Sequence, residues 1–112
     1  MTVSTHVLDT SIGRPAAAVA VALQRQDAGA WVDVSRDVTN ADGRAAALMP
    51  AGTALPPGTY RLTFGAGEYF ARCGVDSFYG TIAIEFIVRD AAAHYHVPLL
   101  VSPYGYSTYR GS

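Results

Sequence analysis

The three histidines of the chain are its clearest candidates for proton transfer. His6 stands in STHVLD, and His94 and His96 stand in HYHVPL. An unperturbed histidine has a pKa of about 6.5, so a neutral imidazole is available as a base near neutral pH. If HYHVPL is a strand, its two histidines point to the same side of a sheet. This pair suits proton transfer, metal binding or surface hydrogen bonding, and the spacing alone leaves the three alternatives open.

Other kinds of catalysis lack the residues they usually need. A zinc site requires a third and usually a fourth ligand, and His6 is the only obvious addition to the pair, so no metal is expected. The sequence has no Gly-x-Ser-x-Gly turn for a nucleophilic serine and no Walker motif for phosphates. Its only glutamates are Glu68 and Glu85, which gives little support for a paired-carboxylate glycosidase.

The last residues of the sequence, YGYSTYRGS, carry tyrosine, arginine and serine side chains to the very end. Chain ends are normally polar and poorly ordered, and they seldom carry functional groups. This segment therefore requires an explanation that composition does not provide. From the residues alone, the purpose of the histidine, arginine and tyrosine set remains open.

Composition narrows the classes of partner. The chain has 112 residues and a net charge of -1, with eight basic residues that are all arginine. Such a balance gives no general attraction to nucleic acids or anionic lipids, so neither is expected as a partner. The longest apolar stretch, PAAAVAVAL, is too short to cross a bilayer, and its surroundings are a poor match to a secretory signal. We expect one domain over residues 1–112 in a cytoplasmic protein.

Cys73 is the only cysteine, which excludes a disulfide within the chain. Nothing about it indicates an oxidising compartment. We expect it to be a small buried hydrophobic residue.

Short alternating segments separated by turn residues predict an all-β sandwich of two packed sheets. The segment at 16–25 is rich in alanine and would also suit a helix, but the neighbouring turns favour a strand. Asp42-Gly43 predicts a tight turn, and Pro98 predicts an edge position or a bulge. The only expected helix is GEYFARCG, at 67–74. The expected strands are 3–9, 16–25, 31–38, 59–64, 81–88, 94–102 and 104–110.

Three blocks of the sequence together resemble the 5-hydroxyisourate hydrolases, the transthyretin-related enzymes of urate breakdown. They are STHVLDTSIGRPA near the start, DGR in the middle and HYHVPLLVSPYGYSTYRGS at the end. The terminal YRGS is the most specific of these signatures. The resemblance implies a transthyretin-like sandwich of two four-stranded antiparallel sheets with one short helix. It also implies a homotetramer, a dimer of dimers, with active sites in the clefts between dimers and no cofactor.

The activity that the resemblance implies is hydrolysis of 5-hydroxyisourate to 2-oxo-4-hydroxy-4-carboxy-5-ureidoimidazoline. The family's functional residues correspond to His6, Arg44, His96 and the terminal segment from Tyr109 to Ser112. We expect His6, Arg44, His96 and Ser112 to be catalytic. Substrate binding is expected from His6, Arg44, Tyr109 and Arg110.

The chemistry of these side chains suggests a role for each. His6 and His96 would activate water and relay its proton, with His96 as the preferred base. Arg44 would bind the substrate and the developing negative charge. Ser112 would position the water, a histidine or the ring through its hydroxyl or through a terminal carboxylate.

Two other classes of function compete with an enzyme. Transthyretin itself shares the implied fold and carries small aromatic hormones without chemistry. A carrier, however, needs apolar channel walls rather than a base and a counter-charge. A structural or adhesive sandwich domain is the third reading, in which HYH and YRGS would be incidental.

Overall fold

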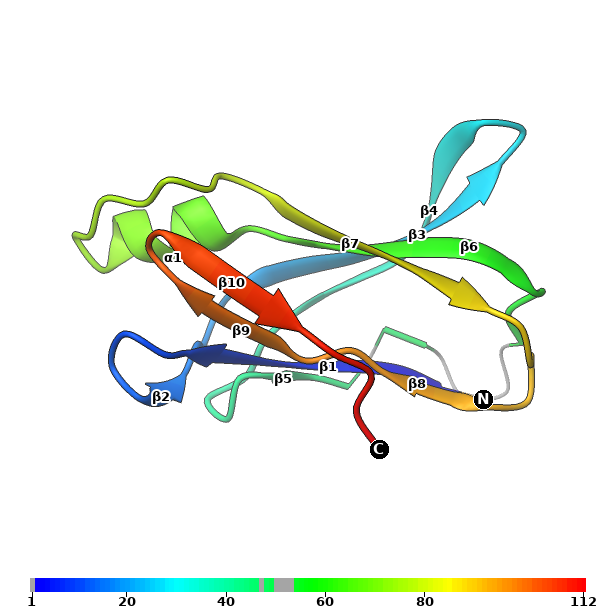
Figure 1. The fold of residues 1–112 in the computed structure, drawn as a ribbon, viewed down its shortest axis with the longest axis horizontal. Coiled ribbons are helices and arrows are strands. Elements are labelled where there is room, and N and C mark those ends of the chain that lie inside the picture. Colours follow the sequence, from blue (N-terminus) through cyan, green and yellow to red (C-terminus); the bar gives the residue numbers. More distant parts are fainter. Residues whose placement is uncertain (1, 47, 50–53) are drawn as a thin grey trace.

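The computed structural model describes residues 2–46, 48–49 and 54–112 as two β-sheets packed face to face, with one short helix at an end of the sandwich (Figure 1). One sheet has four strands in the order β4-β3-β6-β7, and all of its pairings are antiparallel. These strands are β3 (Ala20–Asp27), β4 (Ala30–Val38), β6 (Gly58–Phe64) and β7 (Ile82–Val88). The predicted sandwich is confirmed.

The second sheet is built around β1 (Thr2–Asp9). Its main order is β10-β9-β1-β2, and two further short strands, β5 and β8, also pair with β1. The remaining strands are β2 (Arg14–Pro15), β5 (Arg44–Ala45), β8 (His94–His96), β9 (Leu99–Ser102) and β10 (Gly105–Thr108). Because so many strands meet on β1, its outward side chains have neighbours from distant parts of the chain.

This second sheet differs in two details from the expected four antiparallel strands. It contains six strand segments, because the predicted strand 94–102 is divided into β8 and β9 by Val97 and Pro98, and because the two-residue strands β2 and β5 also pair with β1. In addition, β1 runs parallel to both of these strands. The alternation of apolar residues identifies a strand, but it carries no information about the direction of its partner. Pro98 lies buried at the break rather than on an exposed edge.

The core lies between the sheets and follows the alternation of the sequence. In β6, Tyr60, Leu62 and Phe64 are fully buried, whereas Arg61 and Thr63 between them are only half-buried. Residues from β1, β3, β9 and the helix complete one cluster. Its largest fully buried members also include Phe70, Leu23, Leu48, Ile82, Leu99, Val3 and Val7.

The single helix among the described residues, α1 (Ala66–Arg72), begins one residue before the segment 67–74 predicted for it and ends two residues before that segment does. It buries Ala66, Tyr69 and Phe70 against the end of the sandwich. Cys73, directly after the helix, is exposed, so the expectation that it is buried is wrong. Its place at the solvent side of the helix end, rather than its apolar character, decides its exposure. No helix among the described residues is long and apolar enough to span a membrane.

The predicted tight turn at Asp42-Gly43 fixes the position of the following arginine. The Asn40 side-chain oxygen accepts hydrogen bonds from the backbone N–H of Asp42 at 2.9 Å and of Arg44 at 3.0 Å. The carbonyl of Gly43 then accepts from the N–H of Val7 at 2.7 Å. These bonds tie the turn to β1 and place β5 beside it.

Replacing Gly43 with alanine should destabilise this turn. Gly43 has a φ of +76°, and an added Cβ would lie 2.3 Å from the carbonyl oxygen of Val7. Left-handed backbone strain of about 1–2 kcal/mol and a steric clash of about 1–3 kcal/mol should therefore add. Urea unfolding at a fixed protein concentration measures the loss of stability.

Gly13→Ala is the matched control for that experiment. Gly13 has a similar φ of +64°, but a Cβ there would meet no atom within 4 Å. This control should show the strain without the clash. Equal losses of stability in the two variants would contradict the close approach of Gly43 to β1.

Candidate active site

His6 and Arg44 lie directly opposite each other on neighbouring strands. The antiparallel pairing of β1 with β5 makes them register partners. Directly opposed side chains share one face of a sheet, with Cβ atoms about 5 Å apart. Here that face is the outer one, because Val3, Thr5 and Val7 of β1 point into the core. An imidazole and a guanidinium therefore stand together on the outer face of the sheet.

The hydrogen bond of His6 determines which of its nitrogens is protonated. His6 Nε2 lies 2.8 Å from the backbone carbonyl oxygen of Asp42, in the turn that precedes Arg44. A carbonyl oxygen can only accept, so Nε2–H must donate. In neutral His6, Nδ1 consequently carries the lone pair.

His96 reaches the same face from β8, on the other side of β1. Its register partner on β1 is Ser4, and Nδ1 of His96 lies 2.8 Å from the Ser4 hydroxyl oxygen. Partial burial lowers the pKa of His96, and the charges of Arg44, His94 and His6 lower it further. Each of these causes disfavours the imidazolium. His96 is therefore held in the neutral form that a general base requires.

The terminal segment is attached to the strand that carries His96. The N–H of Gly111 donates to the carbonyl of His96 at 2.8 Å, and the two residues form an isolated antiparallel bridge. Gly111 also lies against the imidazole itself, since a Cβ there would come within 2.5 Å of His96 Cδ2. Only glycine fits this approach, so the Gly in YRGS has a packing reason. Ser112 follows as an exposed residue.

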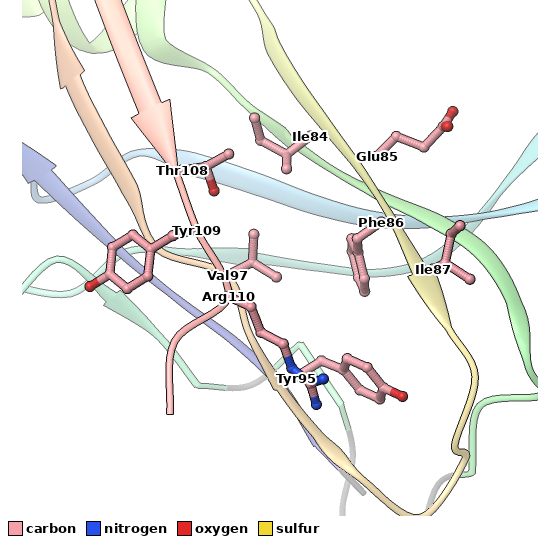
Figure 2. Close-up of a pocket in the computed structure, with 9 residues that line it drawn as sticks. All are labelled: Ile84, Glu85, Phe86, Ile87, Tyr95, Val97, Thr108, Tyr109 and Arg110. Carbon is pink, nitrogen blue, oxygen red and sulfur yellow. The ribbon is translucent and has the colours of Figure 1, made fainter.

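The Arg110 side chain lies on the opposite face of β8 from His96, on the face that carries Tyr95. Its guanidinium lies over the Tyr95 ring, 4.7 Å from the centroid, and its Nη2 donates to the carbonyl of His94 at 3.2 Å. A cavity of about 260 Å³ lies between β7 and the terminal segment. Figure 2 shows the pair of Arg110 and Tyr95 beside it, with the Tyr109 ring pointing away. Ile84, Phe86 and Val97 supply apolar walls.

The structure thus brings only part of the predicted site together. His6, Arg44 and His96 share the outer face of one sheet, and the backbone of Gly111 borders it. The Arg110 side chain lines the neighbouring cavity instead, and Tyr109 borders that cavity with its ring pointing away. Among the described residues, no group of three or more His, Cys, Asp or Glu side chains is arranged to hold a metal ion.

Ser4 escaped the sequence reasoning, and Gly111 was included only as part of the terminal segment, without a role of its own. Ser4 precedes His6 by two residues, so strand alternation already places both on one face. That signal was present in the sequence, but it does not reveal which strand lies beside Ser4. No pattern in the sequence indicates the contact of Gly111 with the His96 ring.

Gly111→Ala should displace His96 or the terminal segment. The new methyl group would collide with the imidazole, and a shift of about 1 Å in a catalytic group can cost up to about a hundredfold in rate. We expect a folded protein whose kcat/KM is lower by about tenfold. Gly105→Ala is the control, because its Cβ would make only an ordinary 3.6 Å contact with Ser102. A Gly111→Ala variant as active as that control would contradict the contact.

Comparison with known proteins gives consistent relatives. Residues 3–111 match the sequence profile of the HIUase/Transthyretin family. A 5-hydroxyisourate hydrolase of Mesorhizobium japonicum is 48% identical, over 97% of this chain and 90% of its own. The structure of Klebsiella pneumoniae 5-hydroxyisourate hydrolase superposes with a TM-score of 0.86 at 43% identity, covering all of both chains. Sea bream transthyretin in complex with thyroxine superposes with a TM-score of 0.91 at 28% identity, over 99% of this chain and 95% of that one.

Proposed function

Because this chain belongs to the HIUase/Transthyretin family, we propose that it is a hydrolase that opens the six-membered ring of 5-hydroxyisourate in urate breakdown. The product is 2-oxo-4-hydroxy-4-carboxy-5-ureidoimidazoline. The observation that carries this proposal is the convergence of His6, Arg44 and His96 on one face around β1. These three residues supply a base, a counter-charge and a second imidazole. No cofactor is required for such a hydrolysis.

His96 is the general base of the proposed reaction. Water attacks a ring carbonyl carbon, and His96 removes one of its protons as the new C–O bond forms. The ring C–N bond then breaks, and the proton passes to the leaving nitrogen. The lowered pKa of His96 supports this role, since the ring is neutral near physiological pH.

Arg44 and His6 act on the substrate. The Arg44 guanidinium is exposed and always charged, so it can bind a carbonyl oxygen and stabilise the oxyanion that develops there. The lone pair of His6 Nδ1 can accept a hydrogen bond from the ring or take part in proton transfer. Its bond to the Asp42 carbonyl supports this assignment because it fixes that nitrogen as the acceptor.

The terminal segment completes the proposed site. Tyr109 and Arg110 bind substrate, and Ser112 positions the attacking water. The exposure of all three supports this, as does the attachment of Gly111 to His96. Arg110 retains further N–H donors beyond the one bonded to His94.

We also propose that the protein works as a homotetramer, a dimer of dimers, in the cytoplasm. Arg44 is exposed and His6 is only half-buried in the single chain, and a hydrolase of this kind benefits from a covered, partly desolvated site. The edge strand β10 and the residues after it present exposed aromatic rings, with Tyr109 59% and Tyr106 43% exposed. Light scattering after size-exclusion chromatography tests the tetramer. An exposed, unpaired Cys73 thiol suits a reducing compartment.

An ultraviolet assay tests the activity. 5-Hydroxyisourate is generated from urate by a urate oxidase, and its decay is followed with and without the protein. We expect decay faster than the spontaneous rate. A decay rate that the protein leaves unchanged would remove the enzyme assignment and favour a small-molecule carrier; the sea bream transthyretin that superposes on this chain is in complex with thyroxine.

A further inference from the structure

Ser4 and His96 are joined through both backbone and side chain. They are register partners in the parallel pairing of β1 with β8, and the N–H of Val97 donates to the carbonyl of Ser4 at 2.9 Å. The hydroxyl of Ser4 lies 2.8 Å from His96 Nδ1 in a half-buried position. The hydroxyl is thus carried by the same backbone pairing that places the imidazole.

The opposite edge of the imidazole is also constrained. Gly111 lies against Cδ2 of His96, the carbon bonded to Nε2. The His94 ring is nearly parallel to the His96 ring, with the centroids 6.3 Å apart and an angle of 10° between the planes. Since Nδ1 faces Ser4, Nε2 lies on the edge that points away from Ser4. It is therefore the nitrogen left to act on water.

We propose that Ser4 is a positioning residue, whose hydroxyl accepts a hydrogen bond from Nδ1–H of His96 and so holds the neutral ring as the tautomer with a lone pair on Nε2. The kinetic part of this inference rests on the proposed function, whereas the tautomer does not. Without Ser4, the site of His6, Arg44 and His96 contains no group that would select this tautomer of the His96 ring.

An accepting hydroxyl suits both protonation states of His96. Nδ1–H donates to Ser4 in the neutral ring and continues to donate after Nε2 has taken a proton, so proton transfer requires no rearrangement there. Burial, the Arg44 guanidinium on β5, and the His94 and His6 rings on β8 and β1 all lower the pKa of His96, whereas the backbone of Ser4 raises it. A hydrogen bond from Nδ1–H to the Ser4 hydroxyl, 2.8 Å away, also favours the protonated ring, so this hydroxyl helps to keep His96 basic enough to accept a proton.

Nitrogen-15 NMR of the histidine rings tests the tautomer directly. Spectra are recorded on the whole protein above pH 7, and the His96 signals are identified by their loss in His96→Asn. We expect Nδ1 to be protonated and Nε2 to be unprotonated in the wild type, with this bias lost in Ser4→Ala. A wild-type ring protonated on Nε2 overturns the proposal, whether or not the protein is active.

Kinetics test the consequence for the reaction. Ser4→Ala should lower kcat about tenfold, which corresponds to one hydrogen bond to a charged group, with a smaller effect on KM. Loss of this bond also destabilises the imidazolium, so the acid limb of the rate profile should move to lower pH. Ser4→Thr, which keeps the hydroxyl, should restore both the rate and the profile.

Ser102→Ala is the matched control for these kinetics. It also removes a half-buried hydroxyl that bonds to a backbone carbonyl, at Gly105, but this hydroxyl touches no histidine. Its kcat and pH profile should equal those of the wild type. A Ser4→Ala variant that matches this control, or a Ser4→Thr variant as slow as Ser4→Ala, overturns the proposal. If Ser4→Ala does not fold, the wild-type NMR spectrum alone decides.

Discussion

His96→Asn should lower kcat on 5-hydroxyisourate at least about a hundredfold, because removal of a general base typically costs that much or more. Asparagine is close in size to part of the imidazole and can still form a hydrogen bond, so the variant should keep its fold. It has no nitrogen that can take a proton near neutral pH. Stopped-flow ultraviolet measurement of 5-hydroxyisourate decay, corrected for the spontaneous rate, provides kcat.

His94→Asn is the control for this substitution. His94 lies two residues away on the same strand, with its ring nearly parallel to that of His96. A variant that loses this imidazole should turn over at nearly the wild-type rate if His96 is the base. Near-normal turnover by His96→Asn would remove its assignment, and a large loss in His94→Asn alone would move the role to His94.

The pH dependence of kcat/KM adds a second measurement on the same residue. A base works only when it is unprotonated, so activity should fall as pH drops through the pKa of His96 in the free enzyme. Burial and neighbouring positive charge hold that pKa below its ordinary value. The acid limb should therefore lie below pH of about 6.5, where an unperturbed histidine titrates. An acid limb above that value would contradict a neutral His96 whose imidazolium form is destabilised.

Much of the fold could be predicted from the sequence because strands with one buried face alternate. Tyr60, Leu62 and Phe64 were expected on one face of a strand, and all three are fully buried. The turn residues around Asp42-Gly43 were equally informative. The direction of pairing was not predictable, because the two parallel partners of β1 come from the end of the chain and depend on the global path.

The residues of the site could be predicted from the sequence, but their spatial arrangement could be predicted less well. His6, Arg44 and His96 come from three strands that meet only through β1, so their proximity depends on register. The terminal segment shows the limit most clearly. Its backbone at Gly111 reaches His96, whereas the Arg110 side chain lies over Tyr95 in the adjacent cavity. Sequence identifies such a segment but does not indicate where each side chain points.

Deletion of residues 110–112 should leave a folded protein with at least about a hundredfold lower activity. The deletion removes no strand of either sheet, because β10 ends at Thr108. It does remove the bond from Gly111 to the His96 carbonyl and the contacts of Arg110 with Tyr95 and His94. Circular dichroism and light scattering check the fold and the assembly, and the 5-hydroxyisourate assay measures the loss.

Stepwise deletion shows which part of the segment matters. Removal of Ser112 alone tests its positioning role and keeps the bridge between Gly111 and His96. Removal of residues 111–112 breaks that bridge but keeps Arg110 over Tyr95. If the bridge aligns the base, the largest single fall in kcat should come at this second step, because a displaced imidazole loses its orientation towards water. A fall confined to the first step would assign the effect to Ser112, and full activity after all three deletions would refute a role for the segment in the site.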